Sequence, residues 1–219
     1  FPVERRYQPL PAHQRFDEAV AIATAELLRQ EPGSLLLFLP GVGEIQRVQE
    51  QLSTRVGGDV LLCPLYGALS LQDQRKAILP APVGQRKVVL ATNIAETSLT
   101  IEGIRLVVDS AQERVASFDP RTGLAKLLTQ RISQASMVQR AGRAGRLEPG
   151  ICLHLTGAEQ AERAAQQSTP EILQSDLSGL VMDLLQWGCP NPDQLTWLNP
   201  PPVVNLTAAR TLLTQLGAL

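Results

Sequence analysis

The sequence predicts an α/β fold in which helices cover both faces of a parallel sheet. Apolar runs such as 35–39 and 87–92 are continuous, which is typical of strands buried on both faces. Between them lie segments whose apolar residues recur at helical spacing. Strands that alternate with helices in this way indicate parallel pairing. Such sheets bind ligands beyond the carboxyl ends of their strands, where polar residues gather in this sequence.

The predicted elements follow in chain order after a segment rich in proline and charge, residues 1–15, which is interpreted as an incoming linker. Pro64 is expected to mark the end of its strand, because proline cannot donate a hydrogen bond to a neighbouring strand. Helices are predicted over 16–30, 42–54, 70–79 and 158–167, and strands over 35–39, 60–65, 87–92, 105–109 and 150–155.

Residues 112–132 interrupt this alternation. Two strand-like segments, 114–118 and 124–129, flank Asp119–Gly123, whose Asp, Pro and Gly favour a turn. The segment is therefore predicted to be a β-hairpin. It could contact nucleic acid through Arg121 and Lys126, or it could simply cover a sheet edge.

The stretch from Gln139 to Arg146 is predicted to be helical and carries the strongest functional signal. At about 100° per residue, Gln139, Arg143 and Arg146 share one narrow stripe of a helix. Guanidinium groups are planar, permanently charged donors that suit phosphate oxygens. The stripe is therefore interpreted as an anion clamp, and a solvated basic helix face is the alternative. Each glycine costs about 1 kcal/mol in a helix, so two glycines in one turn need a reason. Gly142 and Gly145 are therefore expected to allow close backbone approach.

The start of this helix affects how Gln139 is interpreted. Either Ser133 or Ser136 is expected to cap it. Ser136 and Gln139 have the spacing of a capping box, in which Gln139 would serve the helix end instead of a ligand.

A second polar cluster, Thr92–Thr100, follows the strand predicted over 87–92. Its hydroxyl and amide groups could contact the phosphates or sugars of a nucleic acid without reading its sequence. The alternative is a loop in which these side chains cap helix ends.

Composition limits the possible functions. The net charge is −1, so nucleic acid could bind only at a local basic patch. The three cysteines, Cys63, Cys152 and Cys189, lack metal-binding or redox spacing, which suggests a reducing compartment. No signal peptide and no long apolar run is found, so a cytoplasmic protein is expected. The chain begins without Met, at Phe1, and is interpreted as a fragment of a longer protein.

These stretches together resemble the DEAH-box RNA helicases of superfamily 2, and within them the bacterial HrpB type. Residues 92–101 are similar to motif V of that family and residues 139–146 to motif VI. Residues 37–41 resemble motif IV, and residues 169–185 resemble the first helix of the winged-helix domain that follows the motor. The motifs occur in the family's order along essentially the whole chain.

The resemblance implies a RecA-like parallel sheet with flanking helices and an inserted β-hairpin, followed by a small helical segment. Residues 1–15 would be the interlobe linker, 16–160 the second RecA-like lobe, and 161–219 the truncated start of the winged-helix domain. The implied function is the C-terminal motor lobe of an ATP-dependent RNA helicase that translocates 3′ to 5′. A non-catalytic RNA-binding adaptor that holds RNA phosphates on its arginine stripe is the alternative.

The implied cofactors are ATP, or other NTPs, and Mg²⁺ held mainly by the first lobe. That lobe would be the partner in cis, and RNA, single-stranded or structured, the partner in trans. The family's phosphate-binding loop, G-x-x-x-x-G-K-S/T, and its Asp-Glu-Ala-His acid motif do not occur in these 219 residues. The chain alone is therefore expected to be inactive as an NTP hydrolase.

Residue roles also follow from the resemblance. Gln139 would position the attacking water or the γ-phosphate, and Arg143 and Arg146 would act as arginine fingers. Ser98 and Glu102 would approach the nucleotide from motif V. Family members often stack an aromatic ring on adenine near position 79, which is Leu79 here, so a motor that tolerates several NTPs is expected. The implied RNA-binding residues are Thr92, Asn93, Gly41, Ser70, Thr100 and Arg121.

Overall fold

The computed structural model describes residues 1–167, which fall into two compact units. The first unit contains residues 1–113 and 129–167, and within the described residues the second contains the outer part of a hairpin, 114–128. The helices expected after residue 168, and Cys189, lie outside the described residues.

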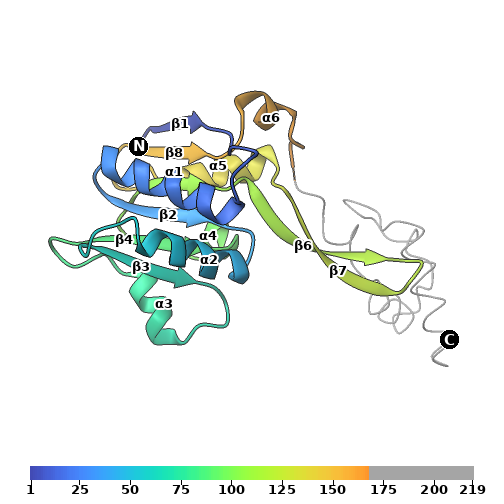
Figure 1. Cartoon of the computed structure of the whole chain (residues 1–219), viewed down its shortest axis with the longest axis horizontal. Helices are drawn as coiled ribbons and strands as arrows, with labels where there is room; N and C mark the ends of the chain where they lie inside the picture. The colour runs from blue at the N-terminus through green and yellow to red at the C-terminus, as the bar shows by residue number, and fades with distance from the viewer. Residues whose placement is uncertain (168–219) are drawn as a thin grey trace, which may run out of the picture. The chain divides into compact units, whose positions relative to one another are not determined.

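A six-stranded, fully parallel sheet forms the centre of the first unit (Figure 1), which confirms the predicted fold class. The strand order is β1-β8-β5-β2-β4-β3. The strands are β1 (Val3–Tyr7), β2 (Ser34–Phe38), β3 (Val60–Leu65), β4 (Arg86–Ala91), β5 (Ile104–Asp109) and β8 (Gly150–His154).

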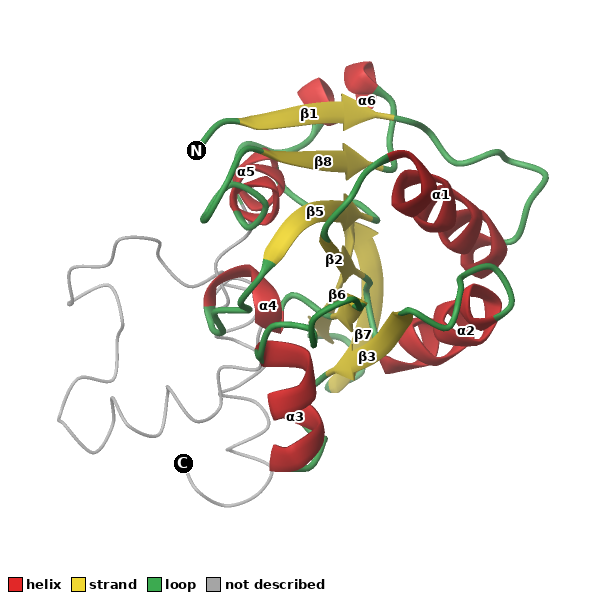
Figure 2. Ribbon diagram, turned by 90° about the vertical axis from the view of Figure 1, so that its left-hand side faces the viewer, coloured by secondary structure: helices red, strands yellow, loops and turns green. Residues whose placement is uncertain are grey.

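Helices cover both faces of this sheet, as Figure 2 shows. Helices α1 (Phe16–Gln30) and α2 (Val42–Ser53) lie on one face, and α3 (Leu71–Ile78), α4 (Ile94–Thr97) and α5 (Gln134–Gly142) lie on the other. The short helix α6 (Ala158–Arg163) follows β8. Alternate residues of β2 divide between the faces, because Leu35 packs in the cluster with α1 and α2 whereas Phe38 packs in the cluster with α5.

Within residues 1–15, which were interpreted as a linker, Val3–Tyr7 form the edge strand β1. This strand pairs in parallel with β8, from Val3 opposite Gly150 to Tyr7 opposite His154. The strand was not predicted because most of its residues are charged. An edge strand does not need the apolar run of a buried strand and is often rich in charge. Pro64 lies in β3, the opposite edge strand, where a missing N–H donor is tolerated.

The predicted hairpin is confirmed as a two-stranded sheet of β6 (Gln112–Asp119) and β7 (Leu124–Arg131). A carboxylate oxygen of Asp119 accepts a hydrogen bond from the backbone N–H of Arg121 at 2.9 Å. Gly123 has a φ of 69°, a conformation that glycine adopts without strain. The turn residues therefore close the hairpin by the chemistry that predicted it.

Two adjacent cations of β4 cap helices on opposite faces of the sheet. The guanidinium of Arg86 donates to the carbonyl oxygens of Leu28, Glu31 and Gly33 at 2.7, 2.6 and 2.8 Å, around the end of α1. The ammonium of Lys87 donates to the carbonyl oxygens of residues 77, 78 and 79 at 2.8, 3.3 and 2.6 Å, at the end of α3. Such carbonyls have no partner within their own helix. Burial lowers the pKa of Lys87 to about 8, so the ammonium is retained at neutral pH.

Replacing Lys87 with methionine is expected to lower the free energy of unfolding by about 1–3 kcal/mol, because three carbonyl groups lose the ammonium donor and only that of Ile78 keeps another donor among the described residues, the backbone N–H of Glu102. Urea denaturation followed by circular dichroism measures the change. Lys76→Met is the matched control, since Lys76 is exposed on α3, and it should shift stability by less than about 0.5 kcal/mol. Equal effects of the two substitutions would contradict the capping role of Lys87.

Candidate functional site

The stretch that carries the strongest sequence signal lies where α5 meets α4, on one face of the sheet. Ser133 caps α5, and its side chain accepts a hydrogen bond from the backbone N–H of Ser136 at 3.1 Å. This geometry decides between the two expected caps. Gln139 is consequently not at the capping-box position, and it lies exposed on the helix.

The prediction of one continuous helical stripe was wrong, because α5 ends at Gly142 and Arg143 is its C-cap residue. Arg143 is half-buried, and Arg146 is exposed beyond the helix end. Burial lowers the pKa of Arg143, the neighbouring charge of Arg146 lowers it further, and Glu96 opposes both effects. The two guanidiniums therefore lie close enough to repel each other, although they do not share a helix face.

The two glycines of this stretch differ in their surroundings. A Cβ atom at Gly145 would lie 2.6 Å from the carbonyl oxygen of Phe1 and 2.7 Å from the side chain of Val3. The expected close backbone approach is therefore confirmed at Gly145. At Gly142 such a Cβ would face open space, because no heavy atom of the described residues outside its own helix and chain neighbours lies within 4 Å.

Arg143 is anchored to motif V through a main-chain oxygen. Its Nε donates to the carbonyl oxygen of Glu96 at 2.7 Å, and its Nη2 donates to the same oxygen. This contact occupies the side-on edge of the guanidinium, and no acceptor among the described residues bonds its end-on edge. Because Glu96 lies in α4, the contact joins the two motifs that the sequence singled out.

Arg140, which has no predicted role, is a fully buried charged group of this region. It is 0% exposed, and its Nε donates to Glu96 at 3.0 Å and its Nη1 to Asp109 at 2.8 Å. Its guanidinium lies 4.8 Å from the centre of the Phe38 ring. The sequence signal for this role of Arg140 was the pair of carboxylates Glu96 and Asp109, because a carboxylate next to a buried segment needs a cation to pair with.

A buried chain of contacts continues from Asp109 to the edge strand β1. His154 lies 2.7 Å from Asp109 through Nδ1, and Arg5 donates to His154 Nε2 at 3.0 Å. Because arginine can only donate, Nε2 accepts and Nδ1 carries the proton that is shared with Asp109. Burial alone would raise the pKa of Asp109, but the charge of Arg140 and the His154 hydrogen bond hold it below the ordinary value.

Several expected RNA-contact residues follow the carboxyl ends of three neighbouring strands, β2, β4 and β3. Gly41 follows β2, Thr92 and Asn93 follow β4, and Ser70 lies after β3, where it caps α3. Asn93 is exposed at the start of α4, and its side chain makes no capping bond there. The capped-loop alternative for Thr92–Thr100 is therefore not found at Asn93.

The remaining expected site residues of motif V lie after α4. Ser98 and Thr100 are exposed, and Glu102 is exposed with its backbone N–H bonded to the carbonyl oxygen of Ile78 at 2.9 Å. Arg121 lies in the hairpin turn, in the second unit, with its side chain 92% exposed and 3.8 Å from Asp119. The two motifs are therefore joined through Glu96, whereas Arg121 belongs to a separate unit.

The donors of this region suit an anion. Arg143, Arg146 and Gln139 offer N–H groups at or near the surface, and within residues 1–167 no group of His, Cys, Asp or Glu side chains is arranged to hold a metal ion. ATP phosphates fit this donor set, whereas Mg²⁺ would need oxygen ligands from elsewhere.

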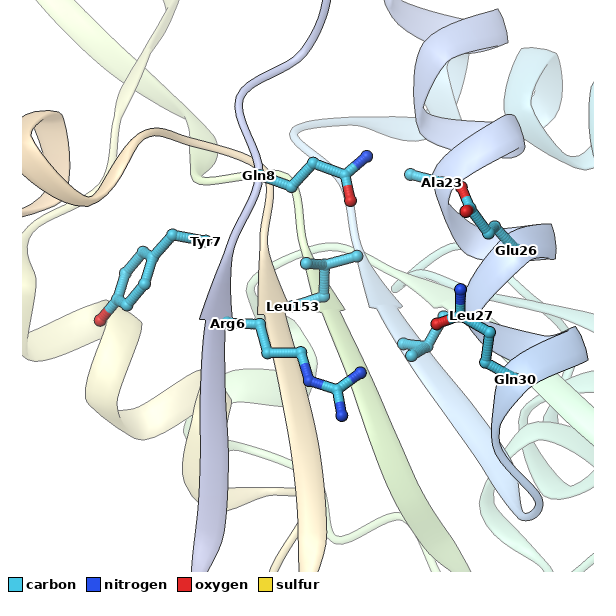
Figure 3. A pocket seen from close by; sticks show the side chains of 8 residues that line it. All are labelled: Arg6, Tyr7, Gln8, Ala23, Glu26, Leu27, Gln30 and Leu153. Atoms are coloured by element: carbon cyan, nitrogen blue, oxygen red, sulfur yellow. The ribbon is translucent and has the colours of Figure 1, made fainter.

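A further pocket lies between β1, β8 and α1, and Figure 3 shows side chains such as Arg6, Glu26 and Gln30 lining it. Its Leu153 packs in the cluster with α1 and α2, so this pocket is on the face opposite α5.

Cys63 and Cys152 are buried free thiols, and burial raises the pKa of each. None of the helices described over residues 1–167 has the length and apolar character that crossing a membrane requires.

Comparisons with known proteins agree with the geometry. The model of the helicase conserved C-terminal domain matches residues 18–148. The ATP-dependent RNA helicase HrpB of Escherichia coli is 82% identical over all of this chain, which covers 27% of that protein. The probable ATP-dependent RNA helicase DHX34 of Homo sapiens is 38% identical over all of this chain, which covers 20% of its length.

A solved structure extends the likeness to three dimensions. The crystal structure of the E. coli DExH-box NTPase HrpB superposes with a TM-score of 0.97, at 82% identity, over all of this chain and 27% of that chain. The chain thus spans about a quarter or less of the length of the relatives it matches. The resemblance that motifs IV, V and VI predicted is confirmed.

Proposed function

The chain belongs to the helicase conserved C-terminal domain family, and we propose that it is the C-terminal motor lobe of an ATP-dependent RNA helicase. In this proposal Arg143 and Arg146 act as arginine fingers on the γ-phosphate of ATP. Gln139 orients the attacking water, and Ser98 and Glu102 approach the nucleotide from motif V. Both motifs belong to the first compact unit.

The observation that carries the proposal is the placement of Arg143. Its side-on edge is fixed by the carbonyl oxygen of Glu96, and the charge of Arg146 lowers its pKa, which indicates that the two cations repel each other. Two like charges held near each other destabilise a surface unless an anion binds between them, so a phosphate group is the ligand that this arrangement favours.

ATP would be shared between this lobe and a preceding one. Sequence resemblance assigns the phosphate-binding loop and the Mg²⁺ ligands to that preceding lobe, which is why the chain alone is proposed to be inactive. Bound ATP and Mg²⁺ supply the reactive phosphoryl group and neutralise its charge. Arg143 and Arg146 then stabilise the charge that develops in the transition state, an effect worth about 10³–10⁵ in rate for an arginine finger.

RNA is proposed to contact the carboxyl edge of the sheet through Thr92 and Asn93, together with Gly41, Ser70 and Thr100. Backbone N–H groups and short polar side chains of this kind position a nucleic-acid backbone without reading bases. Closure of the lobes on ATP and their opening after hydrolysis would move the RNA stepwise, 3′ to 5′. Arg121 in the hairpin turn is proposed to contribute a further RNA contact.

The alternative is a non-catalytic adaptor in which the same arginines hold RNA phosphates. It would use the same exposed cations, Arg143 and Arg146, but it would need no nucleotide. The cytoplasm is the proposed location in either case, because the buried thiols Cys63 and Cys152 are free and such thiols are typical of reducing compartments.

RNA binding by an Arg143→Ala variant separates the two proposals. For a motor lobe, the affinity of a full-length protein containing this chain for single-stranded RNA should stay within about twofold of wild type in the absence of nucleotide. The slope of log affinity against log salt should also be unchanged. Fluorescence anisotropy at several salt concentrations measures both. A slope reduced by about one, with weaker binding whether or not ATP is present, would support the adaptor instead.

A further inference from the structure

Glu96 contacts α5 and its C-cap residue through three of its atoms. Its Oε1 accepts a hydrogen bond from Arg140 at 3.0 Å, and its Oε2 accepts one from the hydroxyl of Ser136 at 3.2 Å. Its main-chain carbonyl oxygen accepts from Arg143 at 2.7 Å. The three partners span α5 from its first turn to its C-cap, so a single residue of motif V fixes the whole helix.

Arg140 holds Glu96 in place from within the domain. Its Nη1 donates to Asp109 at 2.8 Å and to the carbonyl oxygen of Gln112 at 3.2 Å, and the ring of Phe38 lies against its guanidinium. With no exposed surface, Arg140 cannot reach an external phosphate. Its effect on a ligand must therefore pass through the groups that it contacts.

The carbonyl oxygen of Glu96 sets the orientation of the Arg143 guanidinium. A long side chain at a helix end otherwise samples many rotamers, and phosphate binding would have to restrict them. Here the side-on edge is already bonded, so the end-on edge has a fixed direction before any ligand arrives. Preorganised donors of this kind need no rearrangement during the reaction.

We propose that Glu96, held by Arg140, is a positioning residue for Arg143 and determines the direction in which that guanidinium is presented. The proposal rests on the proposed function of Arg143 as an arginine finger. Glu96 itself touches no nucleotide in this account. It differs from the residues implied by resemblance, because its role follows from the three contacts described above.

A double-mutant cycle in a full-length protein containing this chain tests the proposal. Glu96→Gln keeps the carbonyl oxygen that Arg143 uses and removes the charge that Arg140 requires. We expect Glu96→Gln to lower the kcat of RNA-stimulated ATP hydrolysis about tenfold with KM for ATP within about twofold of wild type. Arg143→Lys should lower kcat by itself, and adding Glu96→Gln to it should cause no further loss, because the group that Glu96 positions is already gone.

The outcomes are distinguishable. A further tenfold loss from Glu96→Gln in the Arg143→Lys background would overturn the positioning role, since a general structural defect acts independently of Arg143. Wild-type turnover by Arg143→Lys alone would instead overturn the proposed function. Ser136→Ala, a milder loss at the same carboxylate, keeps the test available if Glu96→Gln does not fold, and its smaller decrease should also vanish in the Arg143→Lys background. Glu26→Gln, an exposed carboxylate on the opposite face, is the control that should leave kcat unchanged.

Discussion

Replacing Arg143 with alanine is expected to reduce RNA-stimulated ATP turnover by about 10³-fold or more in a full-length protein containing this chain. The guanidinium lies at the end of α5 with its side-on edge fixed on Glu96 and with Arg146 beside it. Alanine removes a permanent charge at the place where negative charge is proposed to develop on the phosphoryl group. Steady-state phosphate release at saturating RNA and ATP measures the loss.

The matched control for this prediction is Arg29→Ala. Arg29 is an exposed arginine in the last turn of α1, on the opposite face of the sheet, and its removal should leave turnover within about twofold of wild type. Full activity of the Arg143→Ala variant would show that this side chain is not an arginine finger. A loss that appeared equally in both variants would point to a general defect.

Replacing Arg140 with methionine is expected to lower the free energy of unfolding by about 3–5 kcal/mol. Methionine fills much of the same space but carries no charge, so Asp109 and Glu96 lose their buried cation. Asp109 is 0% exposed and, within residues 1–167, retains His154 and the backbone N–H of Ala111 as donors. Urea denaturation of the 219-residue chain measures the change.

Arg146→Met controls for this stability prediction, because Arg146 belongs to the same stretch but is exposed. It should change the free energy of unfolding by less than about 0.5 kcal/mol while still impairing turnover. Comparing the two substitutions would then distinguish an effect on the free energy of unfolding from an effect on turnover. If Arg140→Met is as stable as wild type, the buried ion pairs contribute little and their proposed positioning role weakens with them.

Periodicity predicted the helices and buried strands of the first unit, because their apolar side chains make the core. It did not predict β1, because Glu4, Arg5 and Arg6 give this edge strand the composition of a solvated segment. The strand is identified by its pairing with β8 in the folded chain. The hairpin could be predicted because the Asp119–Gly123 turn is a local property. Long-range pairing of a polar strand is not encoded in local spacing.

The same distinction applies to the candidate site. Arg143 and Arg146 were found because the pattern of charges and glycines is local, and their roles remain predictions. Their arrangement could not be foreseen, since the helix ends at Gly142 and the orientation of Arg143 depends on a carbonyl oxygen 47 residues away in sequence. Arg140 was overlooked because its carboxylate partners come from α4 and β5, which only the folded chain brings to it.

The adjacent cations Arg86 and Lys87 also lock the alignment of β4 between its neighbours. Successive residues of a strand point to opposite faces, so a slip by one residue would send each cation to the wrong side. The ends of α1 and α3 would then both lose their donors, and both charges would lie next to apolar side chains. Apolar residues such as Val88, Val89 and Leu90 could tolerate that slip, because both faces of the sheet are apolar around them. The selection of a single alignment for this strand therefore rests on its two charged residues more than on its hydrophobic ones.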